Sequence, residues 1–156
     1  MAYMKFNFAA LTHSPERLNV ISTKLGATKG EGYTDADVLK PMVMGKAGNM
    51  VIAAEDAEIE GWLDNVDAGG TTDGFPFGGV ACGTRGMRVE AEIVGAADVL
   101  GFVGAAGQEA VGTKAASGLG KVKAGTPVNH KWRIIAVKDT NAEAAVSGDI
   151  VVLELI

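Results

Sequence analysis

The sequence is poor in the residues that build disulfides and metal centres. It contains one cysteine, Cys82, and two histidines, His13 and His130, which stand far apart in the chain. A single cysteine cannot form an intrachain disulfide, which suits a reducing compartment. The distant histidines and the lone cysteine do not assemble any zinc-ligand spacing. We therefore expect neither a disulfide-stapled mini-protein nor a metal site.

Long hydrophobic runs are also missing. The longest nearly apolar stretch, Val99 to Gly107, has nine residues, whereas a membrane-spanning helix needs about 20. The first twenty residues carry Lys5, Glu16 and Arg17 and have no sustained apolar region. We expect no membrane span and no signal peptide.

Two segments each lack charge of one sign, although the whole chain has a net charge of −5. Ala47 to Thr84 has no lysine or arginine, and Ala110 to Lys138 has no aspartate or glutamate. These segments are either two solvated faces or complementary patches that meet between subunits or on a partner. Because the chain is acidic and does not interleave basic with aromatic residues, we do not expect nucleic acid as a partner.

Recognisable catalytic motifs are absent from the sequence. No phosphate-binding loop occurs, and no G-x-G-x-x-G joins a strand to a helix. Cys82 could form a nucleophilic site with His130 and an acid. A lone cysteine at the end of an apolar strand is, however, more typical of a small buried hydrophobe. We therefore expect no enzyme activity, no catalytic residues and no cofactor.

What the sequence does contain favours β-structure. Twenty-two residues are glycine, and short runs rich in valine, isoleucine and aromatics alternate with turn residues. The fold class that this pattern predicts is all-β, a small β-barrel or jelly-roll-like sandwich of about eight to nine short strands. The predicted strands are Lys40–Gly45, Met50–Ala54, Ile59–Val66, Phe75–Cys82, Met87–Val94, Val99–Val103, Leu119–Val122, Lys131–Val137 and Ile150–Leu155. Ala105–Lys123 is predicted to be a long surface loop.

The N-terminal segment has a different pattern. Ser14 and Pro15 resemble the start of a helix, and helical spacing of apolar residues predicts one short N-terminal helix, Pro15–Leu25. The preceding residues Tyr3, Phe6 and Phe8 are predicted to form an aromatic contact arm. We divide the chain into an arm with a short helix, residues 1–30, and a β-barrel domain, residues 31–156.

Five segments, taken in order, resemble the small head-decoration, or cement, proteins of tailed bacteriophages. The resemblance spans about residues 33–156, and the segments that carry it are Asp37–Met44, Ile59–Leu63, Asp73–Val80, Lys131–Ile135 and Gly148–Leu155. In that family such segments correspond to successive strands of a compact β-domain. The arm and helix are less typical of the family.

The resemblance implies a non-enzymatic protein that binds the outer surface of a phage head and stabilises the capsid lattice. Its implied partners are the major capsid protein and further copies of the same chain, as a dimer or trimer. It would be made in the host bacterial cytoplasm and reside on the virion. Tyr3, Phe6, Phe8, Lys121 and Lys123 are the candidate partner contacts. Two alternatives stay open: a generic β-barrel that binds sugar or lipid, and a small enzyme using carboxylates or Cys82.

Overall fold

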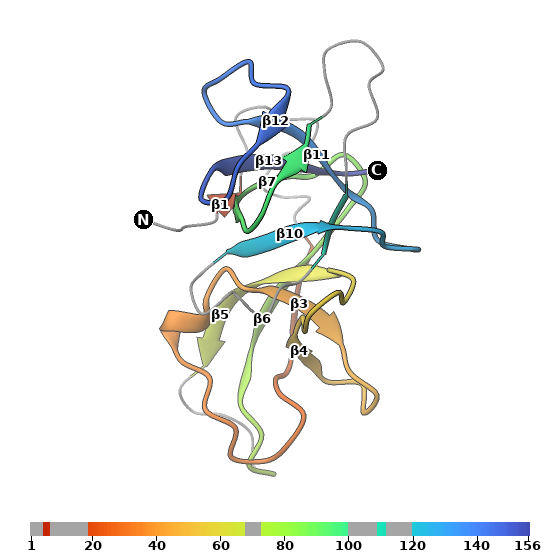
Figure 1. The fold of residues 1–156 in the computed structure, drawn as a ribbon. Coiled ribbons are helices and arrows are strands. Elements are labelled where there is room, and N and C mark those ends of the chain that lie inside the picture. The colour runs from red at the N-terminus through yellow and green to blue at the C-terminus, as the bar shows by residue number, and fades with distance from the viewer. Residues whose placement is uncertain (1–4, 7–18, 68–72, 100–108, 112–119) are drawn as a thin grey trace.

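The protein is all-β, with its strands arranged in several sheets (Figure 1). The computed structural model describes residues 5–6, 19–67, 73–99, 109–111 and 120–156. Within these residues thirteen strands are present, more than the eight or nine expected, because several have only two or three residues. The architecture fits a β-sandwich-like fold.

One five-stranded sheet, here called the β2–β6 sheet, occupies the lower part of Figure 1. Its strand order is β2-β6-β5-β3-β4, and all pairings are antiparallel. An isolated bridge between Leu25 and Met50 brings the end of β2 to the start of β4. The strand bounds are β2 Asn19–Lys24, β3 Pro41–Met44, β4 Met50–Ile52, β5 Gly61–Asp67 and β6 Phe77–Cys82.

A six-stranded sheet, here called the β7–β13 sheet, lies above it. Its order is β1-β7-β10-β9-β11-β13, and β13 pairs in turn with β7, so the pairings from β7 through β13 return to their starting strand. The β7–β10 pairing is parallel and the others are antiparallel. The bounds are β1 Lys5–Phe6, β7 Arg88–Ile93, β9 Glu109–Val111, β10 Lys121–Gly125, β11 Trp132–Val137 and β13 Ile150–Leu155. A separate two-stranded sheet pairs β8 (Ala97–Asp98) with β12 (Ala144–Ala145).

Strand β7 shows why these residues form strands. Val89, Ala91 and Ile93 alternate along the strand and are fully buried in the core. The charged residues that alternate with them, Arg88, Glu90 and Glu92, each lie near an opposite charge from another part of the chain. Arg88 lies 2.8 Å from Glu154, and Glu90 lies 3.3 Å from Lys138. This alternation places apolar side chains in the core on one face of the strand and pairs the charged side chains of the other face.

The two large sheets share one hydrophobic core. Trp62 of β5 and Trp132 of β11 are both fully buried, with ring centroids 5.3 Å apart and planes at 73°. The Trp132 indole N–H donates to the Ile59 carbonyl at 2.8 Å. A smaller core lies within the β2–β6 sheet and contains Leu25, Met42, Met50, Leu63 and Val80.

The expected N-terminal helix is wrong where the structure describes it. Residues Asn19–Lys24 form β2, which pairs along its full length with β6, and residues 15–18 lie outside the described residues. Helical spacing of Leu18, Ile21 and Leu25 competed with the β-branched run Val20, Ile21 and Thr23, and sheet pairing decided the outcome. The described helical structure is one short 3-10 turn at Asp35–Asp37.

The long loop expected at Ala105–Lys123 also needs correction. Its described residues include β9 and the start of β10, which pair with each other. The N-terminal thirty residues contribute strands to both large sheets, with β1 on β7 and β2 on β6. Tyr3, Phe8 and most of the strand predicted at Val99–Val103 lie outside the described residues.

Candidate functional site

The acidic and basic segments of the sequence meet within one chain. We define the inter-sheet seam as residues 53–60, which join β4 to β5, together with Lys123 and residues 127–132. Lys123 on β10 forms ion pairs with Glu55 and with Asp56, the latter at 2.6 Å. The Lys123 ammonium donates hydrogen bonds to the carboxylates of Asp56 and Glu55, and these bonds, that to Asp56 most of all, raise the pKa of Lys123. These ion pairs between the acidic and the basic segment connect one sheet to the other.

Glu58 makes the second polar contact of the seam. Its carboxylate accepts the backbone N–H of Val128 and that of Asn129, the latter at 2.7 Å. His130 Nδ1 lies 3.3 Å from the other carboxylate oxygen. The Asn129 N–H is the largest of the contacts that lower the pKa of Glu58. Three successive residues before β11 are thereby clamped to the β4–β5 connection.

The clamped loop presents an apolar side chain to solvent. Val128 is 77% exposed although its backbone N–H is held by Glu58. Single exposed valines are common on protein surfaces, and the backbone of this one is held by a charge-assisted hydrogen bond to Glu58. Because the backbone is already held, an apolar contact made by this side chain would cost little ordering entropy.

The predicted contact residues occupy different environments. Lys121 lies 4.0 Å from Glu92 of β7, and Lys123 belongs to the seam. The backbone of Phe6 is in β1, opposite Val89. The structure therefore brings Lys121 and Lys123 together on β10 and engages both with acids of the same chain.

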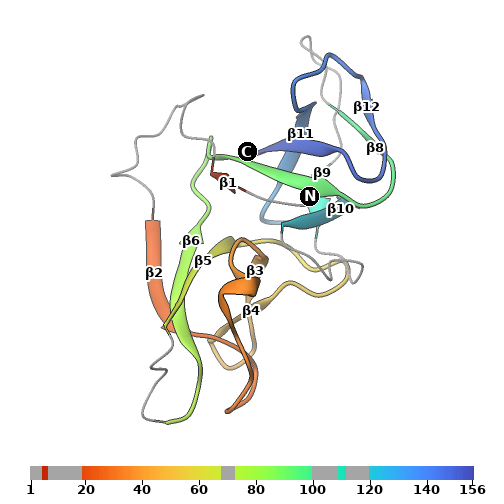
Figure 2. The ribbon, with the colours of Figure 1, turned by 90° about the vertical axis from the view of Figure 1, so that its left-hand side faces the viewer.

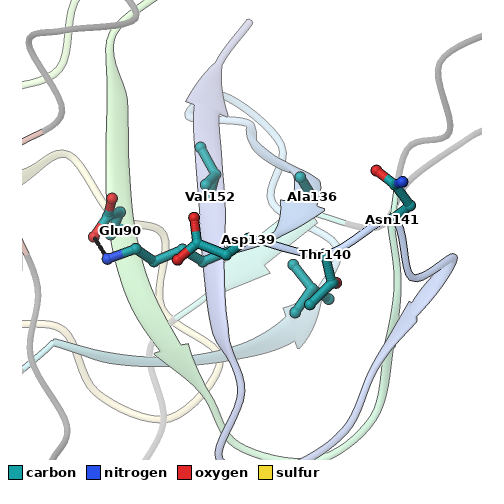
Figure 3. Close-up of a pocket in the computed structure, with 8 residues that line it drawn as sticks. Glu90, Ala136, Asp139, Thr140, Asn141 and Val152 are labelled. Carbon is teal, nitrogen blue, oxygen red and sulfur yellow. Dashed lines mark ion pairs between the residues drawn. The ribbon is translucent and has the colours of Figure 1, made fainter.

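A hollow of about 370 Å³ opens beside Glu90 (Figure 3). Glu90 is only 4% exposed, and Lys138 forms an ion pair with it at 3.3 Å. Val152 lies opposite both Glu90 and Ala136 in the sheet register. The turn after β11 completes the lining with Asp139, Thr140 and Asn141. The lining of the hollow is thus a mixture of polar and apolar groups with one ion pair.

Cys82 lies in an inner strand of the β2–β6 sheet. It ends β6, pairs with Asn19 and Gly61, and is partly buried. Burial, helped by the charge of Glu60, raises the pKa of the Cys82 thiol. A raised pKa lowers the fraction of reactive thiolate. The structure places His130 on Glu58, which gives that imidazole a partner in the seam.

The described residues contain neither a cluster of metal ligands nor a membrane-crossing helix. No three histidine, cysteine, aspartate or glutamate side chains in the described ranges gather as metal ligands would. No helix within those ranges has the length and apolarity to cross a membrane.

Sequence reasoning missed two contacts. Neither the Glu58 clamp nor the Glu90–Lys138 pair follows from sequence spacing, because each joins residues from different elements. The sequence feature that best indicated the seam was the opposite charge of the segments 47–84 and 110–138. Comparison with protein-family models, curated proteins and solved structures finds no match for this chain.

Proposed function

We propose that this chain is a capsid decoration protein that binds the outer surface of a phage head and stabilises the lattice without enzymatic activity. The observation that carries the proposal is where the five segments with the resemblance lie. They include all or part of β3, β5, β6, β11 and β13, and they supply both tryptophans of the shared core. The resemblance therefore concerns the folded framework and is not scattered over the surface.

The use of charge in the seam supports the same proposal. Lys123 and Glu58 both engage groups across the boundary between the sheets. A cement protein must transmit force between the capsid proteins that it bridges, so a body whose parts are fastened together suits the task. Many weak contacts on one rigid lattice gain from high effective concentration, so no single contact has to be strong.

We further propose that the strands from β7 through β13 form a small closed β-barrel. The pairing of β13 with β7 supports this architecture, since a barrel leaves no free sheet edge within its ring. The proposed partners are the major capsid protein and other copies of the chain, and the proposed location is the virion surface.

The direct test is to purify virus particles that carry the gene for this chain and to measure its copies per head by quantitative mass spectrometry. We expect a fixed ratio to the major capsid protein and density on the outer surface by electron microscopy. Heads that contain none of the chain would contradict the proposal.

A variant of the clamped loop tests the contact surface. Val128→Ser should weaken binding of the purified chain to undecorated heads, because the apolar contact is lost while Glu58 still holds the backbone. Val146→Ser is the matched control, since Val146 is also exposed, at 64%, on a different turn. Equal binding by both variants would remove Val128 from the contact surface.

The alternative function, a β-module that binds sugar or lipid, is favoured by the hollow at Glu90. Its hydroxyl, amide and charged groups fit a sugar better than a lipid chain. Titration with a panel of monosaccharides and disaccharides, followed by NMR shifts of the Thr140 and Asn141 amides, would test it.

A further inference from the structure

Among the described strands, β2 stands at one edge of the β2–β6 sheet (Figure 2). All six of its residues pair with β6 in unbroken register from Asn19–Cys82 to Lys24–Phe77. Among the described strands none pairs with its other side, apart from the bridge at Leu25 just beyond its end. A regular strand of this length offers a row of backbone N–H and C=O groups to a further strand.

This edge carries few of the features by which proteins protect open edges. Its first five residues, Asn19 to Thr23, include no charge and no proline, and the pairing with β6 contains no bulge. Val20 is 41% exposed. The one charged residue, Lys24, stands at the far end and pairs with Asp73. Natural edges are usually blunted by charges, prolines or bulges.

The sequence of the edge is compatible with pairing to itself. In an antiparallel pair related by a two-fold axis, one residue must lie opposite its own copy. If that residue is Ile21, Val20 lies opposite Ser22 and Asn19 lies opposite Thr23 of the second chain. No charged residue then faces another, and the β-branched Ile21 pairs with its own copy at the axis.

Packing selects Ile21 for the axis. Ile21 is only partly buried and packs against the core of the β2–β6 sheet. Placing two copies of Ile21 opposite each other would cover their remaining exposed surface and connect the two cores. An axis at Ser22 would instead place a polar, exposed residue at the centre and set Val20 opposite Lys24.

We propose that β2 pairs antiparallel with β2 of a second copy of this chain, centred on Ile21, and so joins two β2–β6 sheets into one continuous sheet. The interaction gives the chain a two-fold homodimer contact. It requires only the purified chain, so it can fail while the proposed capsid function stands, and the reverse also holds.

The first measurement is the solution mass by sedimentation equilibrium across a hundredfold range of protein concentration. We expect a species of twice the 16.0 kDa chain mass. A chain that stays monomeric throughout, or one that forms trimers, would overturn the proposal, because antiparallel self-pairing closes at two copies.

Cysteine cross-linking locates the axis. In a Cys82→Ala background, Ile21→Cys places two thiols directly opposite, at a Cα separation of about 4.5–5.5 Å, within the range that disulfides span. Thr23→Cys is the matched control, because its two copies would stand four residues apart, roughly 13 Å. We expect rapid dimeric cross-linking of Ile21→Cys and none of Thr23→Cys. The reverse pattern, or a dimer in which neither variant cross-links, contradicts the Ile21 register.

Charge reversal gives an independent readout. Ile21→Glu and Ile21→Lys should each be monomeric alone, because like charges meet at the axis, and an equimolar mixture should restore the dimer with one chain of each kind. Circular dichroism of each variant reports whether it is folded. Folded variants that remain dimeric alone would overturn the proposal, and variants that fail to fold leave the decision to the cysteine pair.

Discussion

At the scale of single residues, the two buried tryptophans differ in the hydrogen bonding of the indole nitrogen. Trp132 donates its indole N–H to the Ile59 carbonyl at 2.8 Å. The indole nitrogen of Trp62 is buried, and no hydrogen-bond acceptor for it lies among the residues that the structure describes. Both rings are equally inaccessible to solvent, so the pair separates the contribution of packing from that of the hydrogen bond.

We expect Trp132→Phe to destabilise the protein more than Trp62→Phe does, by about 1–2 kcal/mol, because only the former leaves a buried carbonyl unpaired. The loss of ring volume is common to both variants and cancels in the comparison. Urea unfolding followed by the remaining tryptophan measures each free energy of unfolding. Equal losses, or a larger loss for Trp62→Phe, would contradict the assigned role of the hydrogen bond.

Gly83 stands where the surrounding side chains leave no room for a Cβ atom. A Cβ at this position would lie 2.6 Å from the Trp132 ring and 2.8 Å from Leu155. Gly83→Ala should therefore cost about 1–3 kcal/mol by overpacking. Gly32→Ala is the control, since its Cβ would meet nothing within 4 Å. Thermal unfolding should show a lowered Tm for the first variant and an unchanged or slightly raised Tm for the second.

At the scale of elements, the loop before β11 depends on the charge of Glu58. Its folded pKa is lower than the ordinary value of 4.5, so the carboxylate contributes stability above that pH. The contribution is lost as the pH falls through the depressed folded pKa. Acidification should then release Val128 and Asn129.

We expect Glu58→Gln to lower the Tm at pH 7 and to reduce the loss of Tm between about pH 5 and pH 3 relative to the unsubstituted protein. Glu143→Gln removes an exposed carboxylate elsewhere and serves as the control. The measurement is Tm against pH for the three proteins. A Glu58→Gln curve parallel to the original would show that the clamp does not titrate as described.

Elements were predictable where alternation and burial agree. β7 follows the apolar–charged alternation of its sequence, and β13 lies at the predicted residues 150–155. β2 was not predictable, since residues 19–25 carry both a helical spacing and a β-branched run, and only the contact with β6 decides between them. The Glu58 clamp escaped prediction for a related reason: its atoms are joined by folding across 70 to 72 positions.

At the scale of the whole molecule, the oppositely charged segments of the sequence contact each other through the ion pairs of the seam, which connect the two sheets. Lys123→Glu would place a third carboxylate beside Glu55 and Asp56. It should destabilise the monomer itself as well as any assembly. Lys131→Glu changes the same net charge at an exposed position and should have a much smaller effect.

The expected result is a lower Tm for Lys123→Glu at low salt that partly recovers at 1 M salt, where screening reaches within about 3 Å. Lys131→Glu should stay close to the unsubstituted protein at both salt concentrations. If the two variants behave alike, the charges of Lys123, Glu55 and Asp56 act only through the overall field.

The order of the sheets along the chain has a consequence for synthesis. All five strands of the β2–β6 sheet lie before residue 83, and the β7–β13 ring begins only at Arg88. Emerging from the ribosome, the first sheet can pair while the second is still being made. Trp62 packs against Trp132 in the shared core, and Trp132 is synthesised later. A nascent chain that ends between the two therefore exposes the apolar surface around Trp62. Pauses in translation between these two tryptophans would prolong that exposure. A chaperone that binds apolar surfaces would act on the nascent chain during this interval.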